Sequence, residues 1–286
     1  MRLFLGWIYI ILFASAFFAT PALILLILPV MWSTPFLRML SASYLGSVII
    51  SYLLPGVEWP FFRKLGQLWY EIFEFKANLS PSMISTTLDI GDVESLITCM
   101  HPHGIIPFQG IIWAAYCDQY LKDDDRFCYG FGATADVVLY LPFLRNIMMW
   151  LTAGPCGRDV LYKGLVDGDV SVSPNRKPKH LYILPGGVAE IFTSNIGRNA
   201  MLVKNRYGLM KLSVTTGARL VPTYVFGGND FFYNIANEKS LLAKVSRKFK
   251  MGMLLVSDTL LLFYIFISTT VLILRFSHQF FSFVVS

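Results

Sequence analysis

The sequence predicts an α/β domain with a mixed, partly parallel sheet flanked by helices, preceded by an N-terminal membrane hairpin. Short apolar runs typical of strands alternate with helix-like segments between Glu58 and Lys250, the pattern of an α/β fold. Two of these strands end in turns that contain proline and glycine, and the apolar excess lies at the two ends of the chain. We therefore divide the chain into a hairpin at 1–57, a domain at 58–250 and an atypical apolar tail at 251–286.

The composition indicates a protein that works at a membrane. Of the 286 residues, 55% are hydrophobic and only 15% are charged, which is too apolar for an ordinary soluble enzyme. The middle of the chain is too polar for a polytopic transporter. A net charge of +6 fits an anionic lipid surface or an acidic ligand. The basic residues carry no recognition motif, so we expect no nucleic-acid partner, and a homo-oligomer is left open.

Two apolar stretches form the expected hairpin. Leu3–Trp32 is longer than the roughly 20 residues that cross a bilayer, and Leu40–Leu54 is shorter and follows an expected turn at 33–35. We expect an anchor that is retained rather than a cleaved signal peptide. Arg2 precedes the hairpin, and Arg63 and Lys64 follow it, so both ends should face the cytosol. The cysteines show no paired spacing, which fits reduced thiols.

The elements of the middle domain follow from hydrophobic periodicity and from its breakers. We expect strands at 96–100, 127–131, 181–184 and 219–226, and helices at 105–117, 141–153 and 208–216. Pro222 should make the last strand an edge strand or give it a bulge, and Gly217 should end the last helix. The polar stretch 167–179 should be a surface loop. The apolar tail could span the membrane, lie on it or pack on the hairpin.

The most informative motif is His101-Pro102-His103-Gly104, directly after the first of these strands. Imidazole titrates near neutral pH, so His101 is the candidate base. A position at the start of the next helix would favour its neutral form. Backbone N–H groups after Gly104 could hydrogen-bond an oxyanion, and His103 could hold the substrate or shape the turn.

A second turn, Pro185-Gly186-Gly187, follows the strand at 181–184. Its glycines leave the backbone bare where a ligand could approach. Glu190 comes three residues later and could orient His101, so we predict that the two side chains face each other across adjacent strand ends. A purely structural role for both turns is the alternative. The histidine spacing predicts no metal site. The sequence contains no Gly-x-Ser-x-Gly elbow, which argues against a serine hydrolase.

Five basic residues are candidates for binding the phosphates of a nucleotide-like carrier. They are Arg158, Arg198, Lys204, Arg206 and Lys211. A solvated face, or contact with lipid head groups, is the alternative for each of them.

Taken together, these motifs resemble those of the type-2 diacylglycerol acyltransferases, a family that includes monoacylglycerol and wax-ester acyltransferases. The resemblance covers about residues 60 to 250 and the hairpin. It rests on the motifs already described and on further ones in the family's order: Arg158-Asp159, Arg198-Asn199-Ala200, Asn205-Arg206-x-Gly208-x-x-Lys211-Leu212 and Gly217-Ala218-x-Leu220-Val221-Pro222.

The resemblance implies a glycerolipid-acyltransferase-like fold in the endoplasmic reticulum membrane. It implies transfer of a fatty acyl group from acyl-CoA to diacylglycerol, giving triacylglycerol, with no covalent acyl-enzyme and no cofactor besides the acyl-CoA co-substrate. His101 would deprotonate the acceptor, with Glu190 and His103 in support. The remaining motif residues would bind substrate: Gly104, Pro185, Gly186, Gly187, Arg158, Arg198, Lys204 and Arg206.

The chain departs from the family pattern at two places. Phe226-Gly227-Gly228-Asn229 stands where the family usually has Phe-Gly-Glu-Asn. After about Lys250 an apolar tail replaces a segment that in the family is rich in glycine, proline and aromatic residues and continues the sheet. Other acceptors, monoacylglycerol or a fatty alcohol, are therefore alternatives, as is an inactive truncated partner at the membrane.

Overall fold

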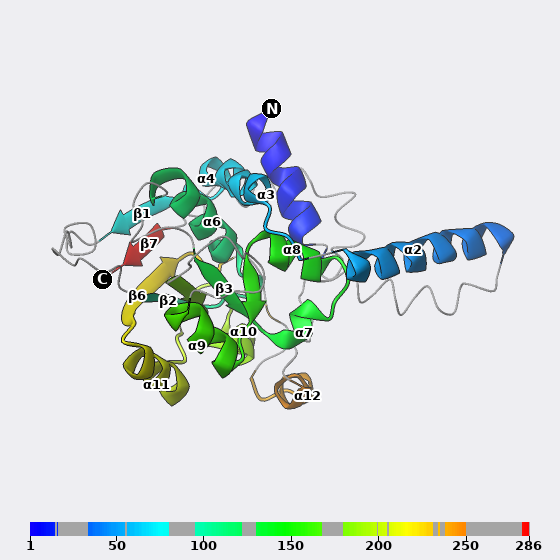
Figure 1. Ribbon diagram of the computed structural model, residues 1–286. Coiled ribbons are helices and arrows are strands. Elements are labelled where there is room, and N and C mark those ends of the chain that lie inside the picture. The colour runs from blue at the N-terminus through cyan, green and yellow to red at the C-terminus, as the bar shows by residue number, and fades with distance from the viewer. Residues whose placement is uncertain are drawn as a thin grey trace.

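In the part of the chain that the structure describes, seven strands form one sheet with helices on both faces (Figure 1). The computed structural model describes residues 1–14, 16, 34–54, 56–79, 95–121, 130–167, 180–198, 200–204, 206–230, 234, 238–249 and 282–285. The strands are β1 (Lys76–Leu79), β2 (Leu96–His101), β3 (Phe131–Thr134), β4 (Ala153–Pro155), β5 (His180–Ile183), β6 (Arg219–Phe226) and β7 (Ser282–Val285), in the order β1-β7-β6-β2-β5-β3-β4.

Five neighbouring strands, β6, β2, β5, β3 and β4, are parallel. β7 runs antiparallel to β6 and parallel to β1, so the sheet is mixed, as the sequence predicts. Parallel strands end at the same edge of a sheet, and in open α/β folds this edge is where ligands bind. The turns after β2, β5 and β6 therefore share one edge.

Two hydrophobic cores cover the faces of the sheet. On one face α6 packs with the aromatic side chains Trp69, Phe73 and Phe108. On the other, Leu165 and Leu212 pack against Ile97. The helices are α2 (Pro35–Leu53), α3 (Pro60–Lys64), α4 (Trp69–Ile72), α6 (Phe108–Tyr116), α7 (Asp136–Leu139), α8 (Leu144–Trp150), α9 (Arg158–Val166), α10 (Gly187–Thr193), α11 (Tyr207–Thr216) and α12 (Leu241–Phe249), with a 3-10 turn at Leu65–Leu68 and a π turn at Cys117–Leu121.

Most of the predicted middle elements are present, with shifted ends. β2, β5 and α11 lie within one residue of their predicted bounds, and Gly217 ends α11 in the left-handed conformation, with φ of 71°. β3 begins at residue 131, later than predicted; 127–129 lie outside the described residues. The helix predicted at 141–153 is wrong at its end. Thr152 has a positive φ of 60°, which ends the helical path, and Ala153 begins β4.

The prediction of an edge or a bulge at Pro222 is half right. β6 runs without interruption and lies inside the sheet, because Thr223–Phe226 pair with β7. Pro222 lies one residue before that paired segment and is exposed. Within the described residues, no strand pairs with it on the β7 side, so its missing N–H disrupts no hydrogen bond there.

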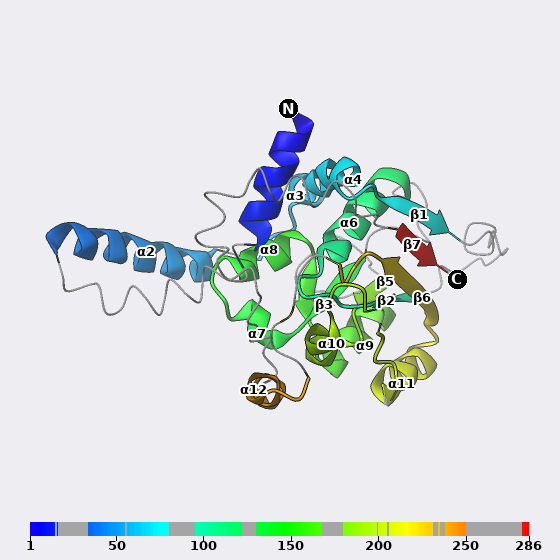
Figure 2. The ribbon, with the colours of Figure 1, turned by 180° about the vertical axis from the view of Figure 1, so that it is seen from behind.

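Two N-terminal helices flank the domain. The helix Arg2–Ala14 buries Tyr9 and Phe13, which contact Trp69 and Phe108 of the main core. α2 projects away from the rest of the molecule (Figures 1 and 2) and is mostly exposed. Among the described residues, α2 is the one helix long and apolar enough to cross a membrane. Residues 17–33, and with them much of the first predicted span, lie outside the described residues, as do 168–179 and 251–281.

Candidate active site

Three turns at the carboxyl edge of the sheet build the site. β2 ends at His101, β5 leads into Pro185-Gly186, and β6 leads into Gly227-Gly228. β2 lies between β5 and β6. The hydrogen-bonding register of these parallel strands thus places the first histidine between two glycine-containing turns.

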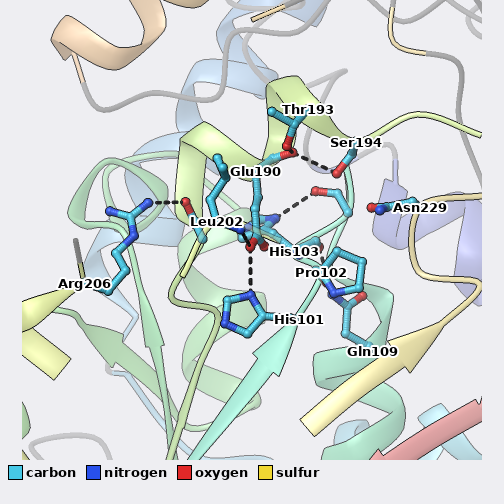
Figure 3. A network of polar contacts seen from close by, with 12 residues as sticks. His101, Pro102, His103, Gln109, Glu190, Thr193, Ser194, Leu202, Arg206 and Asn229 are labelled. Atoms are coloured by element: carbon cyan, nitrogen blue, oxygen red, sulfur yellow. Dashed lines mark hydrogen bonds and ion pairs between the residues drawn. The ribbon is translucent and has the colours of Figure 1, made fainter. Parts of the chain in front are cut away.

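Glu190 is the centre of the polar network in Figure 3. Its Oε1 lies 2.7 Å from His101 Nδ1 and accepts a hydrogen bond from the backbone N–H of Leu202 at 2.8 Å. Its Oε2 accepts the backbone N–H of His103 at 2.7 Å. Glu190 is completely buried, and His101 is only 7% exposed. The side chains that the sequence expected to face each other are therefore in direct contact.

The hydrogen bonds keep the Glu190 carboxyl ionised despite its burial. Burial by itself would raise its pKa, but the hydrogen bonds from His101, Leu202 and His103 outweigh it and hold the pKa below its usual value. A carboxylate only accepts hydrogen bonds, so Nδ1 of His101 must carry the proton that they share. In the neutral ring, Nε2 is then the nitrogen that can accept a proton.

His103 supports the turn with both its backbone and its side chain. Its Nδ1 donates to the Gly104 carbonyl at 2.8 Å, and burial lowers the pKa of the ring. Its backbone N–H already donates to Glu190. The expectation that His101 starts a helix is wrong, because α6 begins only at Phe108; the proton position on His101 follows from Glu190 instead of a helix dipole.

Two glycines are required for this packing. A Cβ on Gly186 would lie 1.8 Å from the carboxyl carbon of Glu190. Gly104 has a positive φ of 68°, and a Cβ there would lie 2.6 Å from the backbone oxygen of Gly228. Any side chain at either position would displace the turn from the dyad formed by His101 and Glu190.

The predicted basic residues differ in how close they lie to the turns that carry His101 and Glu190. Arg206 is half-buried and donates to the Gly186 carbonyl at 2.7 Å, so it braces the second turn. Arg198 and Lys204 are exposed; the carbonyl of Arg198 accepts a hydrogen bond from the Asn229 side chain. Arg158 is also exposed and starts α9 directly beyond β4. Since β4 is three strands from β2, Arg158 lies on the same edge but about 14 Å along it.

One buried polar residue near the site was missed by the sequence analysis. Gln109 on α6 is completely buried, and its Nε2 donates to the carbonyls of Pro102 and His103. A lone glutamine in an otherwise apolar helix was the available signal. Within the described residues, no group of three or more His, Cys, Asp or Glu side chains is placed to hold a metal ion.

Comparisons with known proteins agree with the motifs. A family model described as "Diacylglycerol acyltransferase" matches residues 18–284. Diacylglycerol O-acyltransferase 2-like protein 6 of Mus musculus is 29% identical over 163 residues, covering 57% of this chain and 46% of the relative. Diacylglycerol O-acyltransferase 2 of the same organism is 28% identical over 187 residues, covering 63% and 45%. Diacylglycerol O-acyltransferase 2A of Umbelopsis ramanniana is 26% identical over 187 residues, covering 63% and 48%.

The chain spans about half the length of the curated relatives it matches. No solved structure matches it. The family match covers most of the chain, including β2, β5 and β6 and the turns that carry His101, Glu190 and the glycines. The chain therefore belongs to the diacylglycerol acyltransferase family.

Proposed function

We propose that the chain transfers a fatty acyl group from acyl-CoA to the free hydroxyl of diacylglycerol, giving triacylglycerol. Membership of the family supports this activity at the level of its class. The observation that carries the proposal is the buried contact between His101 Nδ1 and Glu190 Oε1 at 2.7 Å. In this proposal the contact would orient His101 as the base, at the edge of the sheet where α/β folds bind ligands.

In the proposed reaction His101 acts as a general base. Its Nε2 takes the proton of the acceptor hydroxyl while that oxygen attacks the thioester carbonyl, and Glu190 stabilises the imidazolium that forms. The tetrahedral intermediate then collapses, the carbon–sulfur bond breaks, and the imidazolium returns the proton to the leaving thiolate of coenzyme A. No acyl group is attached to the protein at any step.

The oxyanion and the coenzyme need other groups. The N–H of His103 is already engaged with Glu190, so we assign the oxyanion to backbone N–H groups that follow Gly104. The bare backbone of Pro185-Gly186-Gly187 would lie against the thioester. Arg206 and Lys204 would meet the nearer phosphates of acyl-CoA, and Arg198 and Arg158 the farther ones.

The proposed location is the endoplasmic reticulum membrane, with the catalytic domain facing the cytosol. α2 is long and apolar enough to cross a bilayer and is little buried in the molecule. It would anchor the domain where a diacylglycerol in the bilayer can reach the dyad. The charges around the hairpin support a cytosolic domain.

The test is acyl transfer in membranes from a host that lacks neutral-lipid synthesis. Labelled acyl-CoA is supplied with diacylglycerol, monoacylglycerol or a fatty alcohol in parallel, with wild type, His101→Ala and His180→Gln. His180 is a buried histidine at the opposite end of the neighbouring strand β5 and serves as the matched control. We expect label in triacylglycerol that falls by about 10²–10⁴-fold only in His101→Ala. Label in another product would change the acceptor, and equal activity in His101→Ala would overturn the assigned base.

A further inference from the structure

We propose that Gln109 is a positioning residue that holds the first histidine turn against Glu190. Its side-chain amide hydrogen-bonds the two carbonyls that follow His101, those of Pro102 at 2.9 Å and His103 at 2.8 Å. The role rests on the proposed function, because it acts through the base assigned there. Gln109 is 0% exposed, so it cannot itself meet a substrate.

The orientation of the amide follows from its surroundings. Both neighbouring groups are carbonyl oxygens, which only accept hydrogen bonds, so the nitrogen of Gln109 must face them. Among the described residues no donor reaches the other amide atom, Oε1. Burying an amide oxygen without a hydrogen-bond donor costs free energy. Its two donated bonds are therefore the evident reason for a polar side chain at this place in the core.

The amide is held in place by the first turn of α6. Its neighbours Phe108, Ile111 and Ile112 are at most 2% exposed and belong to the main hydrophobic core. A rigid helix therefore presents the amide to the turn. The opposite side of the same turn is held by Glu190, which accepts the N–H of His103 and contacts His101.

The turn is thus held from two sides, and each side supports the other. If the amide is removed, the carbonyls of Pro102 and His103 lose their common donor. The turn is then free to move relative to Glu190, and the bond between Nδ1 of His101 and the carboxylate weakens. The neutral ring of His101 then prefers the Nδ1–H tautomer less strongly, and the imidazolium loses part of its stabilisation.

The experiment uses the full chain in detergent micelles with ¹⁵N-labelled histidine. The chain has four histidines, and loss of one signal in His101→Ala assigns His101. Gln109→Met keeps the size of the side chain but removes both donors. Ile112→Val, in the same helix, is the matched control for a small loss of core packing, of about 0.5–1.5 kcal/mol.

We expect wild type and Ile112→Val to show a single Nδ1–H form of His101. Gln109→Met should show a mixture of Nδ1–H and Nε2–H forms. It should also lower kcat by about 10–100-fold without raising KM for acyl-CoA. An unchanged tautomer in Gln109→Met would overturn the proposal.

A second variant and a readout that needs no turnover separate the positioning role from folding and from the proposed function. Gln109→Leu also removes both donors and should reproduce the tautomer mixture if Gln109→Met does not fold. Loss of the fold in both variants, with Ile112→Val stable, would assign Gln109 to folding alone and overturn the proposal. The tautomer is measured without turnover. A tautomer that responds to Gln109→Met in a chain with no acyl transfer would uphold the positioning role while the proposed function fails.

Discussion

Glu190 joins three hydrogen bonds at one buried carboxylate, and a single atom change tests what that charge does. In Glu190→Gln one oxygen becomes an NH₂ group, which would face one of the N–H donors of His101, His103 or Leu202. We expect acyl transfer to fall by about 10²–10⁴-fold, because the ring is no longer held as the Nδ1–H form. Glu71→Gln is the control, since Glu71 is exposed and 3.8 Å from Arg2. Activity in Glu190→Gln above half of wild type would exclude an orienting role.

The pKa of the His103 ring leads to a prediction of how the stability of the fold depends on pH. Burial lowers the pKa of its ring in the folded chain, so the unfolded chain binds a proton more readily. Its contribution to stability is complete above the unfolded pKa of about 6.5 and is lost as the pH falls through the folded pKa. We expect the Tm of the wild type to fall between pH 7.5 and 5.5. His103→Gln should show a smaller fall, and an equal fall in both proteins would contradict the assignment.

At the scale of elements, a polar clamp fixes the end of α2 to α8. Ser51, buried in the last turn of α2, hydrogen-bonds the Asn146 side chain and accepts the N–H of Phe143. Ser51→Ala would leave these buried groups unsatisfied, which costs about 1–3 kcal/mol. We expect a lower Tm in detergent. Ser47→Ala is the matched control, because the Ser47 hydroxyl donates to the carbonyl of Tyr44 in its own helix. Equal Tm values would mean that the clamp contributes nothing.

The elements also show what the sequence could and could not predict. His101 and Glu190 were paired correctly because each follows a recognisable strand, and parallel strands end together. β4 was missed because its three residues, Ala153–Pro155, are too few to show an alternating pattern. Gln109 was missed because one polar residue in an apolar helix carries no information about its partner. The separation of Arg158 from the dyad depends on strand order, which periodicity does not encode.

At the scale of the whole molecule, the sheet joins distant parts of the chain. β7, at Ser282–Val285, lies between β1 and β6 and pairs with both. Its backbone therefore connects the strand at Lys76–Leu79 to the five parallel strands that carry the site. An apolar run in the tail gave no sign of this, because a uniformly apolar segment shows no strand period.

The sheet connection leads to the last prediction. Val284 pairs with Asn78 on one side and with Tyr224 on the other, so proline at this position would face a strand on either side while lacking an N–H. Val284→Pro should lower stability by about 1–3 kcal/mol and speed amide exchange in β1 more than in β5. Val284→Thr keeps both the N–H and the β-branched shape and is the matched control. If the two variants had equal Tm and equal exchange in β1, β7 would not hold β1 to the sheet, and the parallel strands around His101 would form the stable unit without it.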